Sequence, residues 1–83
     1  MIKGVVLAAR AKTDLAGLGR VVALRVLGAI HRFAETGAGN VKRLHGIDPP
    51  EFRLRVGDFR VRFHDHGEWI EVLRVLNRKD AYR

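Results

Sequence analysis

Four arginines alternate with apolar residues in two neighbouring runs, and their type and spacing suit chemistry on phosphate groups. Arg53 and Arg55 stand in the run FRLRV, and Arg60 and Arg62 stand in the run FRVRF. A period of two predicts a half-buried strand whose alternate side chains share one face. Pairing the two strands would gather all four guanidinium groups on one sheet face. Like charges opposite each other destabilise a sheet, so this face indicates a polyanionic ligand.

A two-residue turn joins the two runs. Gly57-Asp58 separates them, and glycine at the first central position favours a type II′ hairpin. His64 follows at the same spacing, which places an imidazole on the strand face of Arg60 and Arg62. Histidine can accept or donate a proton near neutral pH. The predicted face therefore includes one acid–base candidate beside its cations.

Length and composition limit the class of partner. The 83 residues predict one small domain, residues 1–83, with a net charge of +7 and a sequence pI near 11.1. This basic excess favours a nucleic acid, an acidic protein or an anionic membrane surface as partner. No apolar stretch is long enough to span a bilayer, so we expect no membrane-embedded segment. Because the sequence has no cysteine, disulfides and thiolate metal sites are excluded.

The elements that must position the arginines are a strand, a helical hairpin and three further strands. Apolar spacing near 3.6 residues predicts the long second helix, and a continuous apolar run predicts a central last strand covered on both faces. The short basic segment Val41–Gly46 could form a bent strand. The predicted ranges are Lys3–Ala8 (strand), Ala9–Leu18 and Arg20–Glu35 (helices), the two arginine runs, and Trp69–Leu76 (strand).

These elements predict a two-layer α+β fold with strand order 1-4-3-2. Alternating chain directions place the first strand antiparallel to the last. The helices cover one face of the sheet, and the arginine face stays open.

Several sequence patterns together resemble one family. They are VKRLHG at 41–46, a proline corner, FRLRVGDFRVRF at 52–63, VLRVLNR at 72–78 and AYR at 81–83. The chain resembles the RelE/ParE toxin superfamily of bacterial toxin–antitoxin systems, most strongly from Val41 onward. The resemblance implies a small cytoplasmic toxin that a cognate antitoxin protein neutralises.

The two branches of the superfamily differ in activity. The RelE-like branch implies an endoribonuclease that cuts mRNA in the ribosomal A site, whereas the ParE-like branch shares the fold and poisons DNA gyrase. A degenerate toxin that acts only as a co-repressor, bound to operator DNA through its antitoxin, is a third possibility. In the RelE-like branch, the resemblance implies an active site at Arg53, Arg55, Arg60, Arg78 and Tyr82. All five positions hold residue types that suit RNA cleavage, which favours the RelE-like branch.

When the 2′-hydroxyl of an RNA attacks the neighbouring phosphate, the reaction passes through a dianionic state. Fixed cations stabilise this state. The resemblance implies that the cations that stabilise this state are Arg55, Arg60 and Arg78. Tyr82 would act as the base if neighbouring arginines stabilise its phenolate, or would stack on a nucleobase, and His64 ranks below it. No cofactor is expected. The groups predicted to bind the RNA backbone are Arg53, Arg62 and His64.

Each of these residues has a structural alternative. Arg53 and Arg62 could be solvated strand residues, and Tyr82 could pack against a partner. Arg60 and Arg78 could form ion pairs, with candidate acids at Asp58, Glu71 and Asp80. No histidine has the i, i+4 spacing of a helical metal site, so no metal site is predicted. The histidines assigned to the surface are His31, His45 and His66.

The long helix has a second apolar line beside its predicted core stripe. Val21, Leu24 and Gly28 are spaced at i, i+3 and i+7, and exposed apolar patches mark interfaces. These residues are candidates to seat an amphipathic antitoxin helix. The alternative is that they pack against Leu15 and Leu18 of the first helix.

Overall fold

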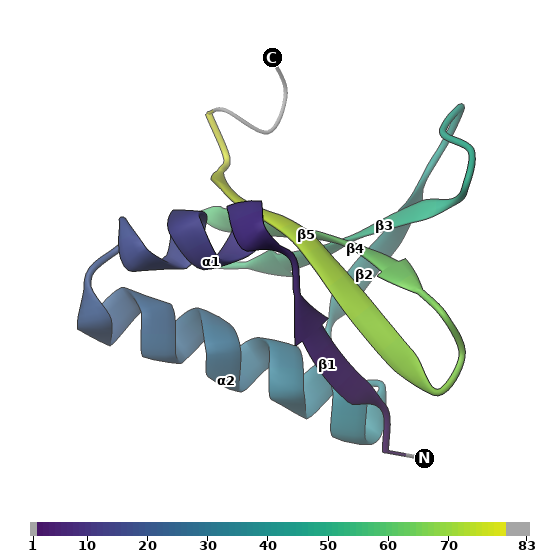
Figure 1. The fold of residues 1–83 in the computed structure, drawn as a ribbon, viewed down its shortest axis with the longest axis horizontal. Coiled ribbons are helices and arrows are strands. Elements are labelled where there is room, and N and C mark those ends of the chain that lie inside the picture. Colours follow the sequence, from purple (N-terminus) through teal and green to yellow (C-terminus); the bar gives the residue numbers. More distant parts are fainter. Residues whose placement is uncertain (1, 80–83) are drawn as a thin grey trace.

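The computed structural model describes residues 2–79, in which one strand and two helices precede four strands (Figure 1). No helix among these residues is both long and apolar enough to cross a membrane. Element boundaries agree with the predicted ranges to within one or two residues. The elements are β1 (Gly4–Leu7), α1 (Ala9–Ala16), α2 (Arg20–Thr36), β2 (Asn40–Leu44), β3 (Glu51–Val56), β4 (Phe59–Asp65) and β5 (Trp69–Asn77).

The sheet has five strands in the order β1-β5-β4-β3-β2. Strands β2 to β5 are antiparallel to their neighbours, whereas β1 is parallel to β5. The predicted four-strand order is correct for the strands it includes, but it lacks β2, and its antiparallel first strand is wrong. Both errors have one cause: the basic segment at Asn40–Leu44 forms a full edge strand. That strand adds one chain reversal, which turns β5 to run with β1.

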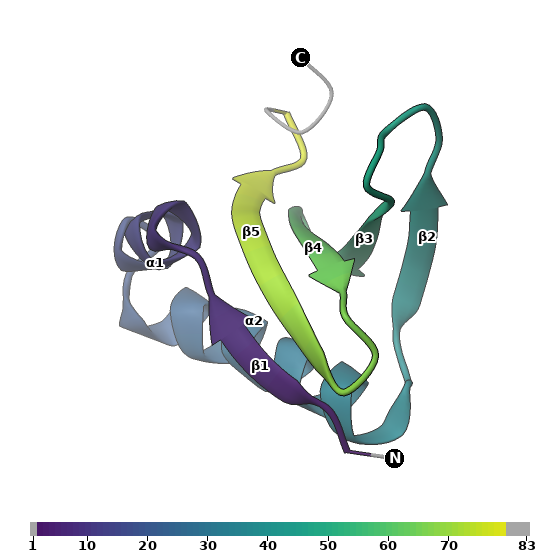
Figure 2. The ribbon, with the colours of Figure 1, turned by 45° about the vertical axis from the view of Figure 1, so that its right-hand side comes forward.

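Both helices lie on one side of the sheet, as Figure 2 shows, with β1 and β2 at opposite edges. The sheet therefore has a covered face and an outer face, as the two-layer prediction requires. Strand β5 lies between β1 and β4 as predicted, but it is not covered on both faces. Trp69, at its start, is 38% exposed.

The core lies between α2 and the middle of the sheet. Val26 and Ile30 of α2 are fully buried, as their helical spacing predicts. Phe63 of β4 is only 1% exposed, and its ring centroid lies 5.3 Å from that of Phe33 and 5.6 Å from that of Phe52. An aromatic cluster therefore joins β3, β4 and α2.

Asp14 fixes α1 against β5. Its carboxylate accepts hydrogen bonds from Arg74 Nε at 2.8 Å, from a second Arg74 nitrogen at 3.2 Å and from the Val75 backbone N–H at 2.9 Å. Burial acts to raise the pKa of Asp14, but these hydrogen bonds and the charges of Arg74 and Arg10 outweigh it, so the pKa lies below its usual 3.8. The carboxylate thus satisfies a backbone donor of β5 beyond the end of β1.

Replacing Asp14 by asparagine should lower the free energy of unfolding at pH 7 by about 1–2 kcal/mol. Because the folded-state pKa is below the unfolded value of 3.8, the charge contributes stability above that pH and loses it as the pH falls through the folded-state pKa. Urea unfolding should show this difference in free energy between the unmodified protein and Asp14→Asn at pH 7, and a much smaller difference in acid. A difference that is equal at both pH values would contradict this assignment, and Glu35→Gln, at an exposed carboxylate of α2, is the control.

Candidate functional site

The four strand arginines share the outer face of the sheet, as predicted. Arg53 of β3 is the cross-strand partner of Arg62 of β4, and Arg55 is the partner of Arg60. Gly57, in the turn between the strands, has φ +56°, as a type II′ turn requires at its first central position. The two-residue turn fixes this register. We call these four residues the arginine face.

Arg60 is not open to solvent, which corrects the expectation of a uniformly exposed face. It is 4% exposed, and one terminal guanidinium nitrogen donates to the backbone carbonyls of Gly57 at 3.0 Å and Phe59 at 3.1 Å. Among residues 2–79 no carboxylate pairs with it, so the proposed ion pairs with Asp58 and Glu71 do not form. Its buried Nε has no hydrogen-bond partner in the same range. Backbone carbonyls therefore hold a fixed cation beneath the surface.

Arg62 has a carboxylate partner that the sequence reasoning missed. Its Nε donates to Glu51 Oε2 at 2.9 Å, and a terminal nitrogen contacts the same oxygen. Glu51 has the strand parity of Arg53 and Arg55, so the spacing of two residues was the signal for its place on this face. The pair neutralises the arginine face at this point and leaves the net positive charge toward the other end.

That cationic end lies beside the β3–β4 turn. Arg55 is exposed, and Arg78 follows Asn77, which is the cross-strand partner of Phe59. The Arg78 backbone N–H donates to the Asp58 carbonyl at 2.7 Å. Strand pairing therefore brings Arg55, Arg60 and Arg78 to one end of the sheet. The predicted Tyr82 and the candidate acid Asp80 lie outside the described residues.

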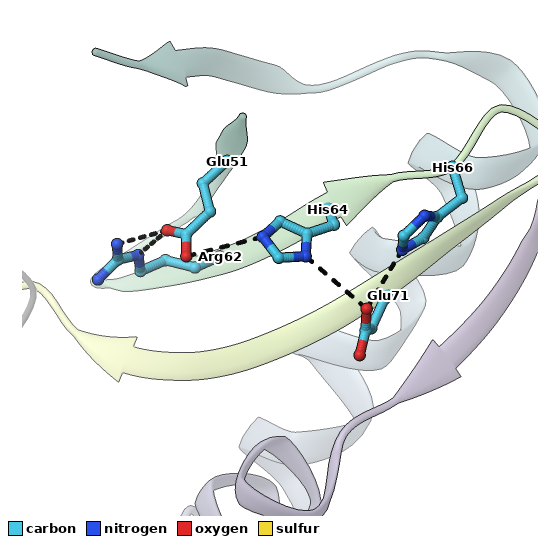
Figure 3. A network of polar contacts seen from close by, with 5 residues as sticks. All are labelled: Glu51, Arg62, His64, His66 and Glu71. Atoms are coloured by element: carbon cyan, nitrogen blue, oxygen red, sulfur yellow. Dashed lines mark hydrogen bonds and ion pairs between the residues drawn. The ribbon is translucent and has the colours of Figure 1, made fainter. Parts of the chain in front are cut away.

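His64 lies at the opposite end of the same face. Four residues along a strand separate it from Arg60, a distance of about 13 Å. Its ring is half-buried between two carboxylates: Nε2 lies 4.0 Å from Glu51 Oε1, and Nδ1 lies 3.7 Å from Glu71 Oε1 (Figure 3). His66 Nε2 also contacts Glu71 Oε1, at 3.2 Å. His64 thus belongs to a separate histidine–carboxylate cluster and does not face the buried arginine.

The second apolar line of α2 is exposed. Val21 is 74% exposed and Leu24 is 58% exposed, so the alternative that they pack against α1 is wrong. A side chain at Gly28 would meet no atom within 4 Å. Next to Gly28 is a hollow of about 490 Å³ that Arg55 also lines. The apolar line therefore leads along the surface toward the arginine face.

Comparison with solved structures identifies the same fold in three toxin–antitoxin complexes. The RelB–RelE complex of Methanococcus jannaschii has 23% identity and a TM-score of 0.74, covering 93% of this chain and 94% of that one. The RelE–RelB complex of Pyrococcus horikoshii has 21% identity and a TM-score of 0.74, covering 96% and 99%. The complex RelBE2 of Mycobacterium tuberculosis has 22% identity and a TM-score of 0.78, covering 96% and 97%.

At the level of sequence, no curated protein matches the chain. A protein-family model described as ParE toxin of type II toxin–antitoxin system, parDE, matches residues 5–82, nearly the whole length. The sequence match and the fold agree on the superfamily, although one names ParE and the other RelE. The chain belongs to the ParE toxin family, within the RelE/ParE superfamily of type II toxin–antitoxin systems.

Proposed function

We propose that this toxin is a ribosome-dependent endoribonuclease that cuts mRNA. The observation that supports this proposal is the cross-strand pair of Arg55 and Arg60. Arg60 is buried with only backbone carbonyls as hydrogen-bond acceptors among the described residues. A buried charge without a counterion is unfavourable by several kcal/mol, so a fold that keeps one has a use for it. A phosphate group bound by both arginines would supply the missing negative charge.

The proposed reaction uses the attacking group of the RNA itself. The 2′-oxygen forms a bond to phosphorus, the bond from phosphorus to the 5′-oxygen breaks, and the 2′-hydroxyl proton leaves as the 5′-oxygen gains one. Arg55, Arg60 and Arg78 would stabilise the extra charge on the phosphate oxygens. Tyr82 is the proposed proton carrier. No cofactor takes part in this scheme.

Binding of the RNA backbone would involve the rest of the arginine face. Arg53 is half-buried beside Arg62, and both could contact phosphates without reading sequence. The ion pair of Arg62 with Glu51 offsets part of its attraction for a phosphate. His64 also lies between carboxylates, which repel a phosphate, so its place in substrate binding is the weakest of the three.

A second candidate function is poisoning of DNA gyrase. The match to a family described as ParE toxin favours it. This activity requires a surface that binds gyrase and no group that cleaves RNA. It would leave the buried charge of Arg60 without a ligand, which is why we rank it second.

Pulse labelling of bacteria after induction of the toxin separates the candidate functions. If the toxin cuts mRNA, methionine incorporation should collapse first while thymidine incorporation continues. Early loss of thymidine incorporation, with DNA breaks, would indicate gyrase poisoning. Normal growth and labelling would exclude both activities and leave the role of a co-repressor on operator DNA.

We further propose that a cognate antitoxin helix docks on α2 at Val21, Leu24 and Gly28. The relatives of the same fold were crystallised with RelB antitoxins. Exposed apolar side chains such as Val21 and Leu24 offer a surface on which the apolar face of an amphipathic helix can pack. An acidic antitoxin could continue from this line onto Arg55 through the adjoining hollow and so block the arginine face.

Placing a charged side chain at the centre of this apolar line should weaken the complex of toxin and antitoxin. Leu24→Glu is expected to raise the Kd for the antitoxin by roughly tenfold to a hundredfold, because it places a charge at a desolvated anchor. Isothermal titration calorimetry measures the change, and circular dichroism checks the fold. Ala9→Glu adds the same charge at an exposed position of α1 and should bind normally. Equal affinity of the two variants would rule out the docking site.

A further inference from the structure

Two histidines of the β4–β5 hairpin and one glutamate converge on the outer face of the sheet (Figure 3). His64 and Glu71 are cross-strand partners, and His66 follows His64 by two residues. One ligand atom from each of the three lies within 4.8 Å of the others. The two histidines lack the helical i, i+4 spacing on which the prediction of no metal site was based. His66 lies one residue beyond the end of β4, and the spacing H-x-H along an extended chain places both rings on one face.

Two distances within this cluster are close to those between the ligand atoms of a bound metal ion. Tetrahedral zinc, with bonds of about 2.0–2.2 Å to nitrogen and oxygen, holds its ligand atoms roughly 3.4 Å apart. Glu71 Oε1 lies 3.2 Å from His66 Nε2 and 3.7 Å from His64 Nδ1. We propose that His64 Nδ1, His66 Nε2 and Glu71 bind a transition-metal dication of the Zn²⁺ class. The three ligand atoms lie within 4.8 Å of one another, so the longer separations would shorten on binding.

The surroundings of the cluster supply the outer contacts that metal sites use. A metal-bound histidine usually donates its other ring N–H to a carboxylate. The free nitrogen of His64, Nε2, faces Glu51 Oε1 at 4.0 Å, and Arg62 holds Glu51 in place. The His66 ring stacks on Trp69, with centroids 4.0 Å apart and an interplanar angle of 20°. Both imidazoles are thus oriented by neighbouring side chains.

The cluster leaves a fourth coordination position for water or a donor from a bound partner. Asp65, the nearest further carboxylate in sequence, accepts hydrogen bonds from Lys3 Nζ at 2.8 Å and from the Gly67 N–H at 2.9 Å. These hydrogen bonds already engage the Asp65 carboxylate, so it is not counted among the ligands. His64 and His66 also line a hollow of about 450 Å³, which Glu71 does not line.

This inference does not rest on the proposed catalytic arginines, because His64 lies about 13 Å from Arg60 along β4. A three-ligand site here would join β4 to β5. It would also offer a partner protein a place to add the fourth ligand.

Zinc binding to the untagged, chelator-treated protein is the test. Trp69 is the only tryptophan of the chain, and its stacking on His66 makes its fluorescence a local reporter; isothermal titration calorimetry gives the stoichiometry. We expect one Zn²⁺ per chain with a micromolar or lower Kd, and a rise in Tm on the order of 10 °C when zinc exceeds its Kd a hundredfold.

Variants decide which residues bind the metal. His66→Ala and Glu71→Gln should abolish saturable binding, and Glu51→Gln should weaken it by about 10–100-fold. His31→Ala, at an exposed histidine of α2, should bind as the unmodified protein does. Circular dichroism of each metal-free variant verifies that it is folded. Millimolar binding to the unmodified protein, or equal binding to Glu71→Gln and His31→Ala, would overturn the proposal.

Discussion

Removing either arginine of the pair Arg55–Arg60 should lower the rate of mRNA cleavage by roughly 10²–10³-fold. Each guanidinium is proposed to stabilise charge that develops on the scissile phosphate. Arg55→Ala is the cleaner variant, because Arg55 is exposed and its loss should leave the fold intact. Arg60→Ala also leaves the carbonyls of Gly57 and Phe59 without their donor, so its rate loss must be read beside its stability.

Single-turnover cleavage in a bacterial translation extract measures this loss. Arg20→Ala removes the same charge from an exposed position of α2 and should cleave at a normal rate. Arg60→Lys keeps a cation but lacks the planar fork, so its rate should lie between those of the alanine variant and the unmodified toxin. If Arg55→Ala and Arg20→Ala cut equally well, the arginine pair does not contact the reacting phosphate.

The largest expected effect on stability is that of Phe63→Ala. Phe63 is 1% exposed and contacts the rings of Phe33 and Phe52. Emptying this position should lower the free energy of unfolding by about 3–5 kcal/mol. Because domains of this size are stable by only about 5–15 kcal/mol, the variant should be partly unfolded at 37 °C.

Urea unfolding followed by circular dichroism measures that change. Leu24→Ala also shortens a large apolar side chain, but at a position 58% exposed, so it should change stability by no more than about 0.5 kcal/mol. Similar losses of unfolding free energy in the two variants would mean that the aromatic cluster is not a main source of the stability of the core.

The two arginine strands could be predicted because every local signal agreed. Apolar and arginine residues alternate strictly, and Gly57 supplies the positive φ that a two-residue turn needs. A turn of that length leaves only one register. The pairs Arg53–Arg62 and Arg55–Arg60 follow from it without knowledge of the rest of the fold.

The edges of the sheet could not be predicted in the same way. Strand β2 is short, carries Lys42 and Arg43, and becomes a strand through pairing with β3. Polar residues are common on edge strands; the sequence indicated a possible bent strand here, but the predicted sheet order did not include it. Because strand direction alternates along the meander, missing this strand also reversed the predicted direction of β5 relative to β1.

The sequence predicted on which face of the sheet the candidate site residues lie, but not which residues they contact. Strand parity placed Arg60 and His64 correctly on the outer face. Their contacts depend on neighbouring strands: Glu71 reaches His64 through the β4–β5 register, which shifts between Arg62 and Phe63. The burial of Arg60 likewise depends on how its side chain folds back onto the turn, which a pattern of residue types does not encode.

Primer extension on a reporter mRNA, with purified toxin and with or without ribosomes, tests the central claim most directly. The proposed activity predicts cuts only on translated message, and it predicts that Arg55→Ala strongly reduces them while Arg20→Ala does not. Intact message, under conditions in which the same protein arrests growth, would contradict the nuclease proposal and favour gyrase as the target.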